Sequence, residues 1–188
     1  PAMLDSRTIY VSEESASGRN LLRIILERRY GIRPTYVDEP QSLDQALRGE
    51  PSLLIGDAAI DAIERFSPDM LWDLGKLWHE WTRAQIVFAV WAARRDVYER
   101  DAASIAACMN TLTDAYTWSR SHMDDVVALA QHAIARPPGF YASYYGKLNF
   151  MLHAAAQSGL AAFCRELVAI GAISSMPLLP ETTGALAS

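Results

Sequence analysis

Hydrophobic and polar residues follow two different patterns along the chain. In the first half, short apolar runs rich in β-forming residues alternate with segments whose apolar residues recur at helical spacing. The predicted strands cover 7–11, 35–37, 52–55 and 86–93, and 70–74 is a further strand or edge segment. The predicted helices cover 21–30, 42–49, 58–66 (with Ile60 and Ile63 facing inward) and 76–82. This alternation predicts an α/β fold with a parallel or mixed sheet flanked by helices.

The pattern changes within the stretch 72–91, which holds four of the five tryptophans. There a short amphipathic helix runs into 86–93, an apolar run without a polar side chain, which is typical of a strand buried on both faces. Beyond residue 100 the spacing is helical, and the predicted helices are 101–122, 123–136, 140–157 and 160–170, with breaks at Pro137-Pro138-Gly139 and Ser158-Gly159. The chain therefore divides into an α/β lobe (5–84), a crossover strand with C-terminal helices (85–173) and a tail (174–188) that we expect to be extended or disordered.

Composition narrows the class of protein. A chain of 188 residues is long enough for one domain or two small lobes, and 51% hydrophobic with 21% charged residues is typical of a globular protein. The net charge of −5 argues against a nucleic-acid partner, which requires a basic surface. No apolar run approaches the ~18 residues of a membrane helix, and the N-terminus does not resemble a signal peptide, so we expect a cytoplasmic protein without a membrane partner. Cys108 and Cys164 are interpreted as two buried, reduced thiols.

The turn after the first predicted strand is the first candidate site. Ser12, Ser15, Ser17 and Gly18 lie where a strand leads into the start of a helix. Free backbone N–H groups and the helix dipole favour an anion there, and a glycine allows a ligand to approach the backbone. The alternative is that Ser15 or Ser17 only caps the helix.

The second candidate is Gly56-Asp57, directly after the predicted strand 52–55. Ligands of open α/β sheets bind outside the carboxyl ends of the strands, so Asp57 is placed to contact a ligand or to act as a base. The alternative is that Asp57 caps the helix that follows. The four histidines show no metal-binding spacing, and no nucleotide-binding motif is present, so neither a metal site nor a nucleotide site is predicted.

Four motifs stand in a fixed order along the chain. They are Ser-Ala-Ser-Gly at 15–18, Leu-Ile-Gly-Asp at 54–57, Asp-Leu-Gly at 73–75 followed by Trp78 and Trp81-Thr82, and Val-Phe-Ala-Val-Trp at 87–91. Together they resemble the menaquinone-biosynthesis family of the futalosine route, in particular its chorismate dehydratase branch. The resemblance extends over nearly the whole chain.

The resemblance implies a fold like the type II periplasmic binding proteins, with a ligand cleft between two α/β lobes. It implies a lyase that eliminates water from chorismate to give 3-enolpyruvylbenzoate, without a metal or an organic cofactor. The ligand would be a small aromatic or enolpyruvyl carboxylate. The substrate contacts that it implies are Ser15, Ala16, Ser17, Gly18, Gly56, Asp57 and Thr82.

Two departures from the family pattern affect this interpretation. The chain begins at what resembles the second lobe, so we expect it to carry at most half of the cleft, and no catalytic residue is assigned. Arg83-Ala84-Gln85 follows Thr82 where the family has Gly-Leu-Pro. Two alternatives therefore stand beside an incomplete dehydratase. One is a non-catalytic module that binds a small carboxylate, and the other is an interaction protein completed by a homodimer partner or by a chain that supplies the first lobe.

Overall fold

The computed structural model of the 188-residue chain describes residues 1–40 and 42–179, and these form two compact units. Unit 1 comprises Pro1–Val90 together with the described residues from Leu152 onward, and unit 2 comprises Trp91–Met151. The boundaries 5–84, 85–173 and 174–188 were expected from the order of elements, and they stay a prediction. No helix in the described part of the chain is both long enough and apolar enough to cross a membrane.

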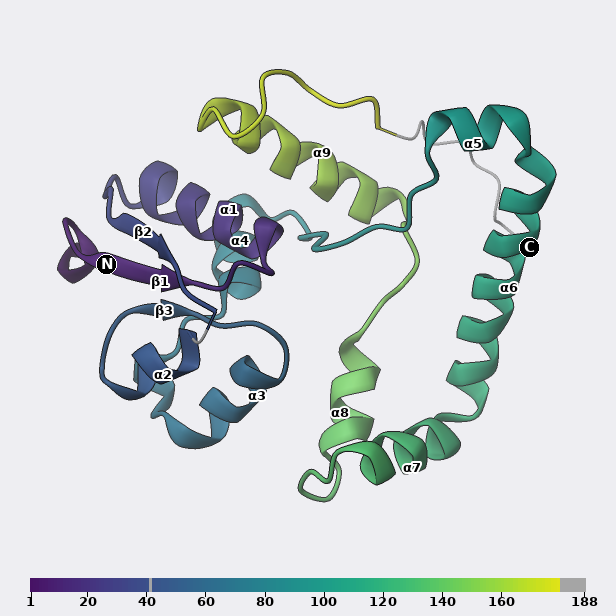
Figure 1. Ribbon diagram of the computed structural model, residues 1–188, viewed down its shortest axis with the longest axis horizontal. Helices are drawn as coiled ribbons and strands as arrows, with labels where there is room; N and C mark the ends of the chain where they lie inside the picture. Colours follow the sequence, from purple (N-terminus) through teal and green to yellow (C-terminus); the bar gives the residue numbers. More distant parts are fainter. Residues whose placement is uncertain (41, 180–188) are drawn as a thin grey trace. The chain divides into compact units, whose positions relative to one another are not determined.

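A small parallel sheet organises unit 1. In the described residues its strands are β1 (Thr8–Val11), β2 (Thr35–Asp38) and β3 (Ser52–Leu53), in the order β2-β1-β3. Thr8 pairs with Thr35 and Tyr10 with Ser52, both in parallel. Three predicted strands are thereby confirmed, although β3 is shorter than expected. The fold is α/β, and all three strands end at the same edge (Figure 1).

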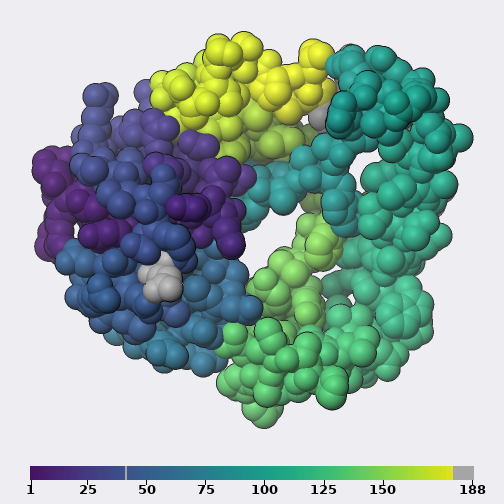
Figure 2. Space-filling view, in the orientation of Figure 1, coloured from purple at the N-terminus to yellow at the C-terminus, as the bar shows by residue number. Residues whose placement is uncertain are grey.

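Helices flank this sheet in unit 1. They are α1 (Ala16–Ile24), which continues through a π-helical turn (Ile25–Arg29), α2 (Ser42–Leu47), α3 (Gly56–Arg65), α4 (Leu74–Thr82) and α9 (Ala154–Ala169), with 3-10 turns at Ala2–Leu4 and Pro68–Met70. The first helix ends where predicted, because Gly31 takes the left-handed φ of +70° that stops a helix. The atoms of the N-terminal strands and of the helices that follow them pack as one continuous surface in the space-filling view (Figure 2).

The core of unit 1 has two layers with α1 between them. On the sheet side lie Ile9, Val11, Leu22, Leu26, Ile32 and Leu53. On the opposite side of α1, where α4 and α9 pack, lie Leu21, Ile24, Ile25, Trp78 and Phe163 (Figure 1). α1 holds both layers together, because its Leu22 belongs to the first layer and its Leu21 and Ile24 belong to the second. Full burial of each such side chain contributes roughly 1.5–3 kcal/mol.

Two buried polar atoms of unit 1 have no hydrogen-bond partner among the described residues. One is the indole Nε1 of Trp78, and the other is the hydroxyl of Tyr36 on β2. Burial, and next the charge of Glu27, raises the pKa of Tyr36 to about 12. The environment of β2 therefore keeps this hydroxyl neutral.

Several predicted elements are wrong. Residues 70–74, predicted as a strand or edge segment, pair with no described strand, because Met70 ends a 3-10 turn, Leu74 begins α4 and residues 71–73 have no regular structure. Ile63, which was expected to face inward, is 68% exposed. Residues 86–93 form no strand either, because an apolar run becomes a strand only where a sheet edge offers backbone partners, and no described strand pairs with them. The predicted break at Ser158-Gly159 is absent, since α9 continues through it.

Unit 2 is helical, as expected. Its helices are α5 (Arg95–Arg100), which was not predicted, α6 (Ala102–Ser121), α7 (Met123–Ala133) and α8 (Phe140–Lys147). The helix expected over 140–157 stops at Lys147, and residues 148–153 have no regular structure. None of the residues in these four helices is buried. Both cysteines are free, but Cys108 on α6 is exposed, so only the buried Cys164 matches the expected buried thiol.

The tail expected over 174–188 is described as far as residue 179. Residues 174–179 form neither helix nor strand, and the tail stays a prediction. The remainder of the predicted tail, 180–188, lies outside the described residues.

Candidate functional site

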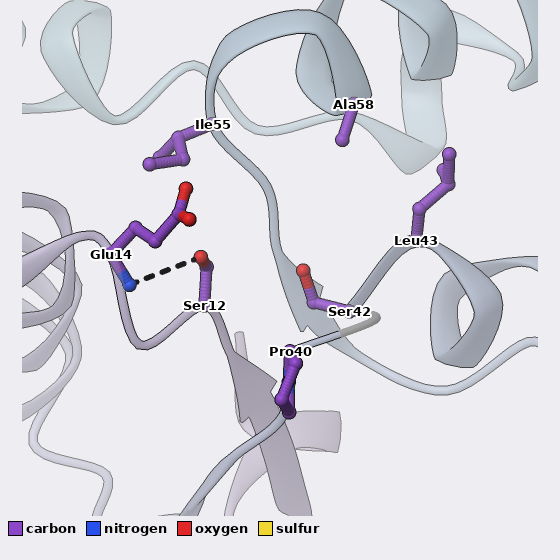
Figure 3. Close-up of a pocket in the computed structure, with 7 residues that line it drawn as sticks. All are labelled: Ser12, Glu14, Pro40, Ser42, Leu43, Ile55 and Ala58. Atoms are coloured by element: carbon purple, nitrogen blue, oxygen red, sulfur yellow. Dashed lines mark hydrogen bonds between the residues drawn. The ribbon is translucent and has the colours of Figure 1, made fainter.

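A pocket of about 140 Å³ lies at the carboxyl ends of the strands. Its described lining residues are Ser12, Glu14, Pro40, Ser42, Leu43, Ile55 and Ala58 (Figure 3). They come from the segments that follow β1, β2 and β3, and parallel pairing brings these segments to one edge. This edge is the usual ligand position in an open α/β sheet, so the pocket is the candidate site.

The turn after β1 is built by backbone hydrogen bonds around Ser12. The backbone N–H of Glu14 donates to Ser12 Oγ at 3.3 Å, and that of Ser15 donates to the Ser12 carbonyl oxygen at 3.2 Å. Ser15 holds the N-cap position of α1, but its side chain accepts no capping hydrogen bond, and Ser17 lies one position inside the helix. The capping alternative for Ser15 or Ser17 is therefore wrong, because Ser15 accepts no capping hydrogen bond and Ser17 lies within the helix.

Gly18 is buried in the first turn of α1. A Cβ atom added there would lie 2.3 Å from Ser15 Oγ and 3.6 Å from Leu53 Cδ2. The absent side chain therefore makes room for Ser15 and for close packing of α1 on β3. Ala16, between Ser15 and Ser17, is exposed at the start of the helix.

Gly56 and Asp57 begin α3, two residues earlier than predicted. The N-cap is Ile55 in extended conformation, so the expected capping by Asp57 is wrong. Asp57 is exposed in the first turn, where a carboxylate stabilises a helix through its dipole. Ile55 before the pair and Ala58 after it both line the pocket. Gly56 and Asp57 are thus adjacent in sequence to the pocket lining.

Thr82 ends α4 and is not among the lining residues of the pocket. Its hydroxyl donates to the Trp78 carbonyl oxygen at 2.8 Å and accepts from the Ala84 N–H at 3.1 Å. Arg83 then takes a left-handed conformation with φ of 61° and ψ of 7°. The O–H of Thr82 and one of its two acceptor lone pairs are therefore engaged at the end of α4.

Comparison with known proteins decides the family. A sequence profile described as menaquinone biosynthesis matches residues 2–169. The chain belongs to this menaquinone biosynthesis family. A chorismate dehydratase from Thermus thermophilus is 25% identical over 174 residues, which cover 85% of this chain and 62% of that enzyme. The chain thus spans less than two thirds of the length of this curated family relative.

The family assignment confirms the resemblance seen in the sequence motifs. The predicted substrate contacts, however, do not all lie beside the pocket. Ser15, Gly56 and Asp57 adjoin lining residues, whereas Thr82 stops α4. Sequence analysis missed Glu14, Pro40, Ser42, Leu43, Ile55 and Ala58 as lining residues. These residues could have been predicted from their position just beyond the three strand ends, because the segments that follow parallel strands lie at one edge of the sheet.

The charges around the pocket are unusual for an anion site. Glu14 is the lining residue with a formal charge, and the remaining described lining is hydroxyl or apolar. Among residues 1–40 and 42–179, no three His, Cys, Asp or Glu side chains lie close enough together to bind a metal ion. The binding groups that the described lining offers are therefore two hydroxyls, one carboxylate and the backbone.

Proposed function

We propose that this chain carries part of a chorismate dehydratase-like enzyme of menaquinone biosynthesis. The proposed reaction is that of a lyase, which eliminates water from chorismate to give 3-enolpyruvylbenzoate without a metal or an organic cofactor. The observation that carries the proposal is the family match over residues 2–169, which is supported by the relative named chorismate dehydratase.

We infer that the pocket at the strand ends is part of the substrate cleft. In a fold like the type II periplasmic binding proteins, the α/β lobe would supply one wall of the cleft and a second lobe the other. Because the chain spans 62% of its relative, a partial cleft is consistent with the alignment. The proposed substrate contacts remain Ser15, Ala16, Ser17, Gly18, Gly56, Asp57 and Thr82, and the geometry supports Ser15, Gly56 and Asp57 best.

The proposed contacts have a physical basis in the two helix starts. α1 begins at Ala16 and α3 at Gly56, and both directly follow segments that line the pocket. The first turn of a helix offers backbone N–H groups to a ligand, so the helix starts beside the pocket can bind an oxygen of the substrate. This would hold the ring in place while the hydroxyl leaves.

The proposed setting is the cytoplasm, with a small aromatic or enolpyruvyl carboxylate as ligand and neither a nucleic acid nor a membrane as partner. Two free thiols are usual in a reducing compartment. A second copy, or a partner chain that supplies the first lobe, would complete the cleft.

Thermal unfolding with chorismate tests the proposal. A ligand present at 100 times its dissociation constant adds about 2.7 kcal/mol, which corresponds to a rise of about 5–11 °C in Tm for a chain of this size. We expect chorismate and 3-hydroxybenzoate to raise Tm, and we expect turnover only when the remainder of the relative is supplied as a second polypeptide. Stabilisation by amino acids but not by these carboxylates would instead favour a non-catalytic binding module.

Chromatography for 3-enolpyruvylbenzoate measures turnover, with chorismate alone as the control for spontaneous decay. Conversion by the isolated chain would show that no second polypeptide is required. Failure of chorismate both to stabilise the chain and to react in the complemented mixture would refute the proposed function.

A further inference from the structure

Glu14 is in an unusual position for a site that is expected to bind an anion. Its carboxylate extends into the pocket between Ser12 and Ile55 (Figure 3). Its backbone N–H is tied to Ser12 Oγ at 3.3 Å, but its carboxylate makes no hydrogen bond or ion pair within residues 1–40 and 42–179. The pocket therefore contains a negative charge that no described side chain neutralises.

The helix starts at this edge explain why a carboxylate is tolerated there. The N-terminal ends of α1 and α3 carry positive partial charge, and Glu14 lies two positions before Ala16, the first residue of α1. The chain thus supplies its own anion to this edge. A second anion entering the pocket would meet the Glu14 charge at short range.

A bound ligand would remove water from the Glu14 carboxylate. An ionised carboxylate accepts hydrogen bonds but donates none, so the ligand must bring a donor to replace the lost water. A ligand hydroxyl provides that donor. A ligand carboxylate has no proton to donate and adds repulsion between like charges.

We propose that Glu14 is a specificity-determining residue that makes this pocket select a hydroxyl of the ligand over a second carboxylate. The inference rests on the proposed function, in which the ligand is a small hydroxy acid. Its consequence is an orientation: the hydroxyl that dehydration removes points into the pocket at the strand ends, and the carboxylates of the ligand lie outside this pocket.

Two ligands that differ in one group test this selectivity. They are 3-hydroxybenzoate and benzene-1,3-dicarboxylate, each titrated calorimetrically into the 188-residue chain at low salt. We expect the wild-type chain to bind the hydroxy acid at least tenfold more tightly. Glu14→Gln removes the charge and keeps the size, and it should reduce this ratio at least fivefold by strengthening binding of the dicarboxylate.

Glu13→Gln is the matched control. Glu13 and Glu14 are both exposed and lie in the same turn, but Glu13 does not line the pocket, and its substitution makes the same change in net charge. We expect the Glu13 variant to keep the wild-type ratio. Equal effects of both substitutions would overturn the inference, because they would show a general charge effect. The inference would also be overturned if the wild-type chain bound both benzoates equally well. The same holds if neither the wild-type chain nor the Glu14→Gln variant bound either benzoate.

The result is separable from the test of the proposed function. If chorismate neither stabilises the chain nor reacts, while Glu14→Gln alone changes the ratio of the two benzoates, the proposed function fails and the role of Glu14 stands. If chorismate binds and both variants keep the wild-type ratio, the role of Glu14 fails and the proposed function stands.

Discussion

Substitution of Gly159 by alanine should destabilise the chain, against the usual effect of this change in a helix. Gly159 lies inside α9, and a Cβ atom there would be 2.1 Å from the backbone carbonyl oxygen of Gln85. Glycine to alanine within a helix normally stabilises by about 1 kcal/mol. Overpacking costs about 1–3 kcal/mol, and the upper end applies because the obstacle is backbone and not a flexible side chain. The expected net loss is about 2 kcal/mol.

Gly146→Ala is the matched control, since Gly146 lies in α8 and nothing stands within 4 Å of its added Cβ. We expect this variant to gain up to about 1 kcal/mol, so the two variants should differ by about 3 kcal/mol, or about 6–12 °C in Tm. Urea unfolding followed by circular dichroism measures the stability of both variants, and tryptophan fluorescence reports on the surroundings of α9, because Trp78 packs on Phe163 of α9 at 6.0 Å. If Gly159→Ala were as stable as the wild type, the close contact between α9 and Gln85 would be refuted.

Three further predictions concern single side chains. Arg83→Gly should raise the free energy of unfolding by about 0.5–1 kcal/mol, because a left-handed conformation costs a non-glycine residue about 1–2 kcal/mol and the greater freedom of unfolded glycine offsets part of the gain; a lower urea midpoint than that of the wild type would contradict this. Iodoacetamide should modify the exposed Cys108 on the order of tenfold or more faster than the buried Cys164, whose pKa is raised by burial, and peptide mapping that found equal labelling in the native chain would refute the burial. The pKa of Tyr36 rises from 10.0 to about 12 on folding, so its contribution to the unfolding free energy is fully present below pH 10 and is lost as the pH rises through 12. Tyr36→Phe should therefore lose less stability than the wild type between pH 9 and pH 11.5 in urea titrations, and equal losses would show that this hydroxyl is not the cause.

The local patterns of the sequence were sufficient to predict most strands and helices of unit 1. β-forming runs became β1 and β2, and glycine at position 31 ended the first helix as expected. These predictions succeeded because turn chemistry and apolar spacing act within a few residues. The motif order along the chain also indicated the family, which the match over residues 2–169 confirmed.

The apolar run 86–93 shows where local pattern was insufficient. Its composition favours a strand, but a strand exists only through hydrogen bonds to a neighbouring strand, and the described sheet offers none to it. The same dependence on partners applies to Ser158-Gly159. Sequence alone suggested a break there, whereas the glycine serves the close approach of Gln85 to an unbroken helix.

The sequence by itself determined the class of fold, the family and the edge of the sheet where a site should be sought, because these follow from short-range periodicity and from the order of strands. Only the tertiary structure decided which side chains meet at that edge. Ser12, Ser42 and Ile55 are distant in sequence, and parallel pairing of three strands brings them together around the charge of Glu14. Neighbours of this kind depend on the register and direction of the strands, which are set by packing against α1 and not by any local run of residues.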